Sequence, residues 1–536
     1  MNQYVDNILH AFAQLDDDND QLQRIQTLAP ELNWVEPADI DALLINLAEL
    51  SGGISPNILD RGLEIVVGRL SRQSATAQPD DQPLDVSSLV QAISQLYLAI
   101  LPESRGRNYL LGWLANMNRA KSLDRFVDLI LESPPTCPNS IVMAFAPLLK
   151  VNNDVPIDHL FPKLLGGLQH RSVAAAILDL ANFLTREKRV AEHPASGHSE
   201  SLIKLLGMLT EQLTMLEEGK IPEGKQPNEI SAIVNDTVSL IASLCDSLAL
   251  VGDENAIGKL NRASELKHRR IRTEALWALA SLGQESSGQQ LIELAAEPIS
   301  RLRVIQYARE LDLIDEVDEQ YTSDESIAES QLAMWLAHPS NMGLAPKELQ
   351  LMDQRFLAWP GFDDPQSCFL FRYSYELSQS RIDNIGISGP LCHAFSMNLQ
   401  HLANSDIYAC FAGWHCTHEE IMEMGIPQAR LQRPGLVERL TARLSSEQID
   451  ELDFENMEPQ FLGLFMGAEA LILNAKVNGQ WGTLIVTRDT VDWFPADPEN
   501  SPAKTELAYS IYKGRKLLGA FNQPEFWPGL EETTHD

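Results

Sequence analysis

A segment of this chain recurs 31 residues later, and this recurrence constrains the fold more than any other feature. The stretch SLALVGDENAIGKLNRA begins at Ser247 and aligns with ALASLGQESSGQQLIEL, which begins at Ala278. The alignment pairs Leu248 with Leu279, Gly252 with Gly283 and Leu260 with Leu291. A period of this length is typical of one helical hairpin per repeat. Because one hairpin cannot bury its apolar stripe alone, we expect neighbouring hairpins to stack.

The same rhythm extends over the N-terminal part of the chain. From Met1 to about His338 nearly every segment has apolar residues at spacings of three and four, which predicts amphipathic helices and no strand. SVAAAILDLANFL, from Ser172, aligns with the helix near Arg272 at a shift of 99, or three periods of about 33 residues. We therefore expect residues 1–340 to form a helical-repeat domain. Its buried positions should include Ala275, Leu276, Leu279 and Leu291.

One part of this region resembles a known family. RIRTEALWALASLG, from Arg270, followed by QESSGQQLIELAAEP, is similar to a HEAT repeat of the short bacterial kind named after the phycobilisome lyases. The resemblance covers roughly residues 235–313. It implies a right-handed α-solenoid of paired helices with a protein-binding concave face. The repeat brings no catalytic residue of its own.

Beyond His338 the pattern changes from helical to mixed. SCFLFRYSYEL, from Ser367, alternates aromatic and other side chains with a period of two, which predicts a strand with one aromatic face. IGISGP, from Ile385, is a second strand candidate, and Asn478-Gly479 between two β-rich runs predicts a hairpin. Helices are expected over DIYACFAGWHCTHEEIMEM, which starts at Asp406, and over PGLVERLTARL. The fold class is therefore mainly α, a HEAT-like solenoid over 1–340 followed by a smaller α+β domain over 341–536.

Charge and cysteine content limit the classes of partner. The formal net charge of −34 disfavours binding to nucleic acid or to an anionic membrane surface, although it also serves as ordinary solubilising charge. The acidic N-terminus does not resemble a signal peptide, and no apolar run reaches the length of a membrane span. Six cysteines are few for 536 residues, so a reducing cytoplasm is the expected location.

One cluster contains metal-ligand residue types. On a continuous helix His415, His418 and Glu419 would share one side, with Cys416 beside them, and this is a usable arrangement for a metal. The alternative is that the cluster reflects packing and solvation, since neither paired ligands at zinc-site spacing nor the HExxH motif is present. A further alternative is that Cys392 and His418 form a nucleophilic pair. Cysteine and histidine are common enough, however, that coincidence also explains their presence in one domain. We expect no metal and no cofactor.

A basic cluster stands out in this acidic chain. Arg269, Arg270 and Arg272 open a predicted helix, and Arg301 and Arg303 follow 31 residues after the last two. The spacing predicts a positive stripe along consecutive repeats that would dock an acidic segment of a partner protein. In the alternative interpretation these side chains pair with carboxylates of neighbouring repeats.

Together these features favour a cytoplasmic, non-enzymatic scaffold or adaptor that binds another protein through the solenoid. The rival interpretation is an enzyme or enzyme accessory, either through the resemblance to bilin lyases or through a Cys/His site in the C-terminal domain. A pocket lined by His393, His415 or His418 would favour the enzyme, because catalysis needs convergent polar groups in a cavity.

Overall fold

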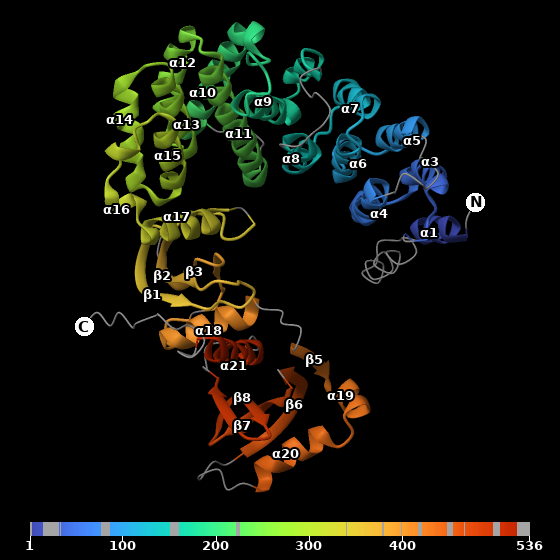
Figure 1. Ribbon diagram of the computed structural model, residues 1–536, viewed down its shortest axis with the longest axis vertical. Helices are drawn as coiled ribbons and strands as arrows, with labels where there is room; N and C mark the ends of the chain where they lie inside the picture. The colour runs from blue at the N-terminus through green and yellow to red at the C-terminus, as the bar shows by residue number, and fades with distance from the viewer. Residues whose placement is uncertain are drawn as a thin grey trace. The chain divides into compact units, whose positions relative to one another are not determined.

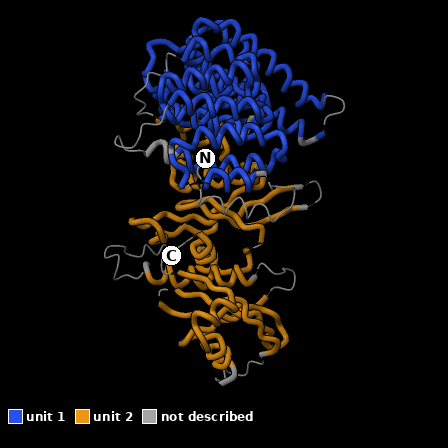
Figure 2. Tube along the Cα trace, turned by 90° about the vertical axis from the view of Figure 1, so that its right-hand side faces the viewer, with its two compact units in different colours: residues 1–293, 307–313 blue, residues 294–306, 314–536 orange. Residues whose placement is uncertain are grey.

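The computed structural model describes residues 3–13, 32, 34–76, 86–150, 160–220, 226–338, 340–377, 380–397, 399–415, 421–446, 454–465, 467–496 and 504–522. The chain divides into two compact units, shown in Figure 2. The first consists of Met1–Glu293 and Tyr307–Leu313, and the second of Leu294–Gln306 and Ile314–Asp536.

The first unit is built from helices, and the described part of residues 3–338 contains no strand, as the sequence predicts. In chain order these helices are α1 (Gln3–Ala13), α3 (Ile40–Leu50), α4 (Pro56–Thr76), α5 (Val86–Ala99), α6 (Arg105–Asn116), α7 (Ala120–Glu132), α8 (Pro138–Phe145), α9 (Arg171–Arg186), α10 (Ser199–Glu217), α11 (Pro227–Val251), α12 (Ile257–Ser264), α13 (Arg269–Ser281) and α14 (Glu285–Glu293). Helix α15 (Pro298–Glu310) contributes its end to this unit.

Helices of the first unit pack in two rows (Figure 1). Many helices contact the one two places further along the chain: α3 packs on α5, α4 on α6, α5 on α7 and α6 on α8. Later in the chain α9, α11 and α13 form one row, while α10 packs on α12 in the other. Such packing buries the apolar stripe of each helix between its neighbours, which an isolated hairpin cannot achieve.

The 31-residue repeat has a structural counterpart at the helix ends. Gly252 follows α11 with φ +76°, and Gly283 follows α13 with φ +82°, a left-handed conformation that glycine adopts without steric cost. The paired leucines of the repeat, Leu248, Leu279, Leu260 and Leu291, are all fully buried. Ala275 and Leu276 are buried as well, so the burial predicted from the sequence is confirmed.

Helix α11 is long and apolar enough over Glu229–Val251 to meet the length and composition of a membrane span. In its apolar window of 18 residues, 56% is buried inside the unit, where α11 packs on α9, α10 and α13. Asp246 of α11 also forms an ion pair with Arg186 of α9 at 2.5 Å. The apolar composition of α11 is therefore explained by its place as an inner helix.

A buried polar network fixes the segment after α9 to the helical core. The His193 ring accepts a hydrogen bond from the Ala195 amide at Nδ1 (3.1 Å), so Nε2 carries the proton and donates to Asn182 Oδ1 at 2.9 Å. The same Asn182 oxygen accepts from Ser247 Oγ of α11 (2.8 Å), and its amide nitrogen donates to the Ser243 carbonyl (3.2 Å). Burial lowers the pKa of His193 to about 4.

The second unit contains two antiparallel sheets and the helices that cover them. Its first sheet is formed in order by β1 (Glu348–Leu357), β2 (Gln366–Leu377), β3 (Ser380–Ser388) and β4 (His393–Ala394). Its second is formed in order by β5 (Ile421–Gly425), β6 (Phe454–Phe465), β7 (Ala468–Val477), β8 (Gln480–Thr487) and β9 (Val491–Pro495). The helices are α16 (Glu319–Thr322), α17 (Asp324–Ala337), α18 (Asn404–His415), α19 (Ile426–Gln432), α20 (Leu436–Ser446) and α21 (Lys504–Phe521).

Each sheet is covered by helices on both faces. The aromatic face of β2 packs on Leu332 and Leu336 of α17, while Leu370 and Cys368 on its other face pack on α18. The second sheet buries Leu471 and Leu473 against α20, and Ile472 against Tyr509 and Tyr512 of α21. Because both faces are covered, β2 and β7 bury side chains in both directions instead of alternating between core and solvent.

Helices α18 and α21 approach each other closely because glycines stand at their contact. Gly413 of α18 lies against the Ser510 carbonyl and the backbone of Gly514, and Gly514 of α21 lies against the Ala409 carbonyl. A Cβ atom at either glycine would overlap these backbone atoms. The Arg515 guanidinium adds a bidentate pair with Asp406, at 2.7 and 2.8 Å. This contact joins the two sheets through one helical layer.

The strand predictions are confirmed by β2, by β3 and by the hairpin of β7 and β8, in which Asn478 and Gly479 both have positive φ. Other boundaries differ. Helix α17 packs on the first sheet and belongs to the second unit, so the division expected at residue 340 falls earlier in the chain. Helix α18 ends at His415, and Ile421–Gly425 forms strand β5 where the sequence predicted helix.

We predict that the first unit loses stability as pH falls from 6.5 toward 4, because the unfolded chain protonates His193 near its usual pKa of 6.5 whereas the folded chain resists protonation until about 4. The folded state then binds fewer protons, and the loss should reach about 3 kcal/mol at the low end. Urea unfolding followed by circular dichroism at several pH values measures it. His193→Gln should reduce the change of the unfolding free energy with pH, whereas His198→Gln on the same segment should leave it unaltered. If the unfolding free energy changes equally with pH in both variants, His193 is not the group responsible.

We also predict that Gly514→Ala destabilises the second unit by about 2 kcal/mol, the usual cost of forcing an extra carbon into a packed contact. The matched control is Gly519→Ala on the same helix, where nothing lies within 4 Å of an added Cβ. Alanine is the better helix former by about 1 kcal/mol, so the control should keep or raise the melting temperature. Similar melting temperatures for the two variants would show that the close contact is not needed.

Candidate functional site

The basic cluster predicted from the sequence is divided between the two units. Arg269 and Arg270 are exposed in the first turn of α13, and Arg272 is half-buried one turn further on. Arg270 lies near His268, whose pKa is lowered first by burial and then by that guanidinium. Arg301 and Arg303 lie on the part of α15 that belongs to the second unit. The five arginines are therefore not a stripe within one unit.

Arg301 is an interior side chain. It is 3% exposed and donates to the Ala295 carbonyl (2.8 Å) and the Ser326 carbonyl (2.8 Å). It also pairs with Glu329 at 2.5 Å and lies over the Tyr321 ring, 5.2 Å from its centre. These contacts connect α15 with α16 and α17. Arg301 thus pairs with a carboxylate inside the protein, as the alternative interpretation of the basic cluster expects, and it is not accessible to a partner. Arg303 is exposed.

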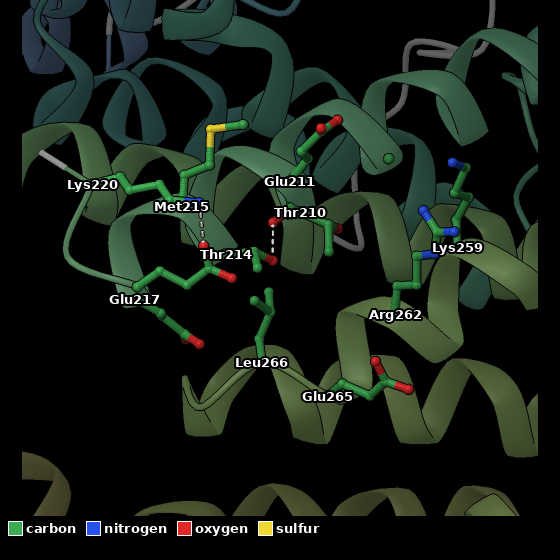
Figure 3. Close-up of a pocket in the computed structure, with 12 residues that line it drawn as sticks. Thr210, Glu211, Thr214, Met215, Glu217, Lys220, Lys259, Arg262, Glu265 and Leu266 are labelled. Atoms are coloured by element: carbon green, nitrogen blue, oxygen red, sulfur yellow. Dashed lines mark hydrogen bonds and ion pairs between the residues drawn. The ribbon is translucent and has the colours of Figure 1, made fainter. Parts of the chain in front are cut away.

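A groove in the first unit lies between α10 and α12 (Figure 3). Its volume is about 520 Å³. Thr210, Thr214 and Met215 line it from α10, and Leu266 closes its floor from the segment after α12. Thr210 is buried, and its hydroxyl oxygen has no hydrogen-bond partner among the described residues.

Both signs of charge line the rims of the groove. The acidic residues are Glu211, Glu217, Glu218 and Glu265, and the basic residues are Lys220, Lys259 and Arg262. Glu218 pairs with Lys220 at 2.6 Å, and Glu217 accepts from the Lys267 amide at 2.9 Å. The Lys259 side chain lies directly over Gly207, so close that a Cβ atom at position 207 would require it to shift slightly.

The groove was not predicted from the sequence. A signal was nevertheless present, because α10 carries two methionines seven residues apart, Met208 and Met215, on one side of an otherwise amphipathic helix. They are 55% and 45% exposed. Exposed methionines are common on surfaces that bind varied partners, since the side chain is flexible and polarisable.

Among the described Cys and His residues of the second unit, His393 and His415 lie near enough to interact electrostatically, whereas Cys392 contacts a serine. His393 stacks on Trp414 at 3.9 Å and contacts Phe395 edge-on, and burial lowers its pKa. The Cys392 thiol contacts Ser388 Oγ at 3.5 Å, and burial raises its pKa, which opposes thiolate formation. His415 is exposed at the end of α18 and lies 3.5 Å from the Trp359 indole nitrogen.

Cys416, His418 and Glu419 lie outside the described residues. Among the described residues no group of three His, Cys, Asp or Glu side chains is arranged to hold a metal ion. Neither the α10–α12 groove nor a second pocket between α20 and α21 is lined by His393 or His415.

We predict that Arg301→Gln destabilises the second unit by about 3 kcal/mol, because it leaves the partly buried Glu329 carboxylate without its cation. Arg309→Gln, an exposed change on the same helix, should alter stability by less than about 0.5 kcal/mol. Chemical denaturation of both variants measures the difference. Equal stability of the two variants would mean that the interior contacts of Arg301 are not needed for folding.

Comparison of the chain with protein-family models, with curated proteins and with solved structures finds no match.

Proposed function

We propose that the helical unit is a HEAT-type solenoid that acts as a non-enzymatic scaffold and binds a segment of a partner protein in the α10–α12 groove. The observation that carries the proposal is the groove itself, an open channel between two stacked helices with an apolar floor and both charges on its rims. The 31-residue repetition of buried leucines and left-handed glycines supports the repeat assignment.

The chemistry of the groove supports a polypeptide ligand. Met215 and Leu266 offer apolar contact, and Thr210 offers a buried hydroxyl without a partner. Arg262 and Glu265 are charged groups of opposite sign that a mixed-charge segment can pair with, which gives specificity more than affinity. The proposed contact surface is thus the row formed by α10 and α12.

The proposal places the protein in the cytoplasm. Its support is that the cysteines described, Cys137, Cys245, Cys368, Cys392 and Cys410, are all free thiols, as a reducing compartment allows. The strong negative charge of the chain supports a protein partner over nucleic acid or an anionic membrane.

Site-specific photocrosslinking tests this function. A photoreactive amino acid at Met215 should capture one polypeptide reproducibly in cells, because this side chain lines the groove. The same residue at Met143, which is 59% exposed on α8, is the matched control and should not capture that polypeptide.

Charge reversal gives a second measurement. Lys259→Glu with Arg262→Glu should abolish capture from position 215, and capture by the unaltered protein should weaken as salt increases. The double variant Lys204→Glu with Lys121→Glu changes net charge equally at exposed sites outside the groove and should retain capture. Capture that is equal at positions 143 and 215, or that survives reversal in the groove, would refute the proposal.

A further inference from the structure

The second unit contains a pocket of about 920 Å³ at one end of its five-stranded sheet. Helix α20 lies on one face of this sheet and α21 on the other (Figure 1). The pocket is lined by both helices, by the β6–β7 turn at Gly467 and by the β8–β9 turn at Arg488. Four separate segments therefore meet around one cavity.

The charge of this pocket is opposite to that of the chain. Four cationic side chains line it, namely Arg439 and Arg443 from α20, Arg488 from the β8–β9 turn and Lys516 from α21. Two carboxylates line it, Glu469 and Asp489, and Glu469 pairs with Arg433 at 3.5 Å. The chain as a whole is rich in carboxylates, with a formal charge of −34. The excess of cations in this pocket is therefore a local feature and does not follow from the composition of the chain.

The framework around the cations is held by specific hydrogen bonds. Arg443 Nη1 donates to the Thr487 carbonyl, which ties α20 to the β8–β9 turn. Within that turn Thr487 Oγ1 accepts from the amides of Asp489 (3.2 Å) and Thr490 (2.8 Å). Arg439 and Arg443 are four residues apart, so they share one face of α20. Arg488 thus lines the pocket from a turn whose backbone is fixed, while Arg439 and Arg443 line it from α20.

Apolar and aromatic groups complete the lining. Leu436 and Leu440 belong to the buried face of α20, and Tyr512 contacts Phe465 edge-on with ring centres 6.4 Å apart. Lys516 Nζ lies 5.6 Å from the centre of the Tyr512 ring. Arg439, Arg488 and Lys516 are exposed at this lining, so their charges are accessible to an anion from solution.

We propose that this pocket binds a small molecule that carries two or more phosphate groups. Cations from three elements converge here with fewer carboxylates than are needed to balance them, and a bound polyanion removes their repulsion. Guanidinium groups form paired hydrogen bonds to phosphate oxygens, and a compact polyphosphate offers enough charge for all four side chains. A single carboxylate carries too little charge to do so.

Calorimetric titration of the full chain with inorganic pyrophosphate, and with orthophosphate for comparison, tests the proposal. Pyrophosphate should bind more tightly than orthophosphate, and Arg439→Gln or Arg488→Gln should each weaken pyrophosphate binding about tenfold or more, since each removes a charge-assisted hydrogen bond. Arg430→Gln is the matched control, because Arg430 pairs with Glu438 at 2.9 Å and does not line the pocket. It should bind pyrophosphate as the unaltered protein does.

Thermal unfolding separates a binding role from a structural role. Without ligand, Arg488→Gln should keep or raise the melting temperature, because it removes one of the mutually repelling cations, and it should lose the rise that pyrophosphate produces. Absence of pyrophosphate binding, equal weakening by Arg430→Gln, or an octa-glutamate peptide that binds through the same arginines while pyrophosphate does not, would each overturn the proposal. The last outcome would assign the pocket to a protein segment instead.

Discussion

The contact between α18 and α21 holds the second unit together. Each sheet has two apolar faces, and each is stable only when helices cover both. Helix α18 covers one face of the first sheet and α21 one face of the second, and glycines at 413 and 514 let the two backbones approach closely. The Arg515–Asp406 pair fixes their orientation. The pocket between α20 and α21 depends on this contact, because it positions the helix that supplies Lys516.

The first unit is organised by a different principle, in which each helix is stabilised by its neighbours along the chain. Buried leucines recur at one hairpin's length, and the turns that end α11 and α13 use the same left-handed glycine. Between the repeated elements lies a polar network of Asn182, His193 and Ser247 that is fully paired. Apolar packing holds neighbouring helices together, whereas a satisfied polar network fixes their register, since a slip would leave buried donors and acceptors without partners.

The two proposed sites use charge in opposite ways within one acidic chain. The α10–α12 groove carries both signs and suits a polypeptide segment with mixed charge. The pocket near α20 carries an excess of cations and suits a compact polyanion. A scaffold that binds a protein through its helical unit and a phosphorylated small molecule through its second unit would have two separate ligands in one chain. The two proposals are independent, because their residues lie in different units.

The sequence by itself determined the elements whose signal is local. Periodicity predicted the helices and the β2 strand, and Asn478-Gly479 predicted the hairpin, because side-chain spacing and left-handed backbone preference act over a few residues. Tertiary structure decided which residues from distant segments are buried together, pair with each other or line one pocket. The 31-residue spacing suggested that Arg301 is equivalent to Arg270, yet Arg301 is buried against Glu329 while Arg270 is exposed. His418 lies outside the described residues, so its helical spacing from His415 stays a prediction. Arg439, Arg488 and Lys516 are remote in sequence, so only the folding of α20 and α21 around the sheet brings them to one pocket.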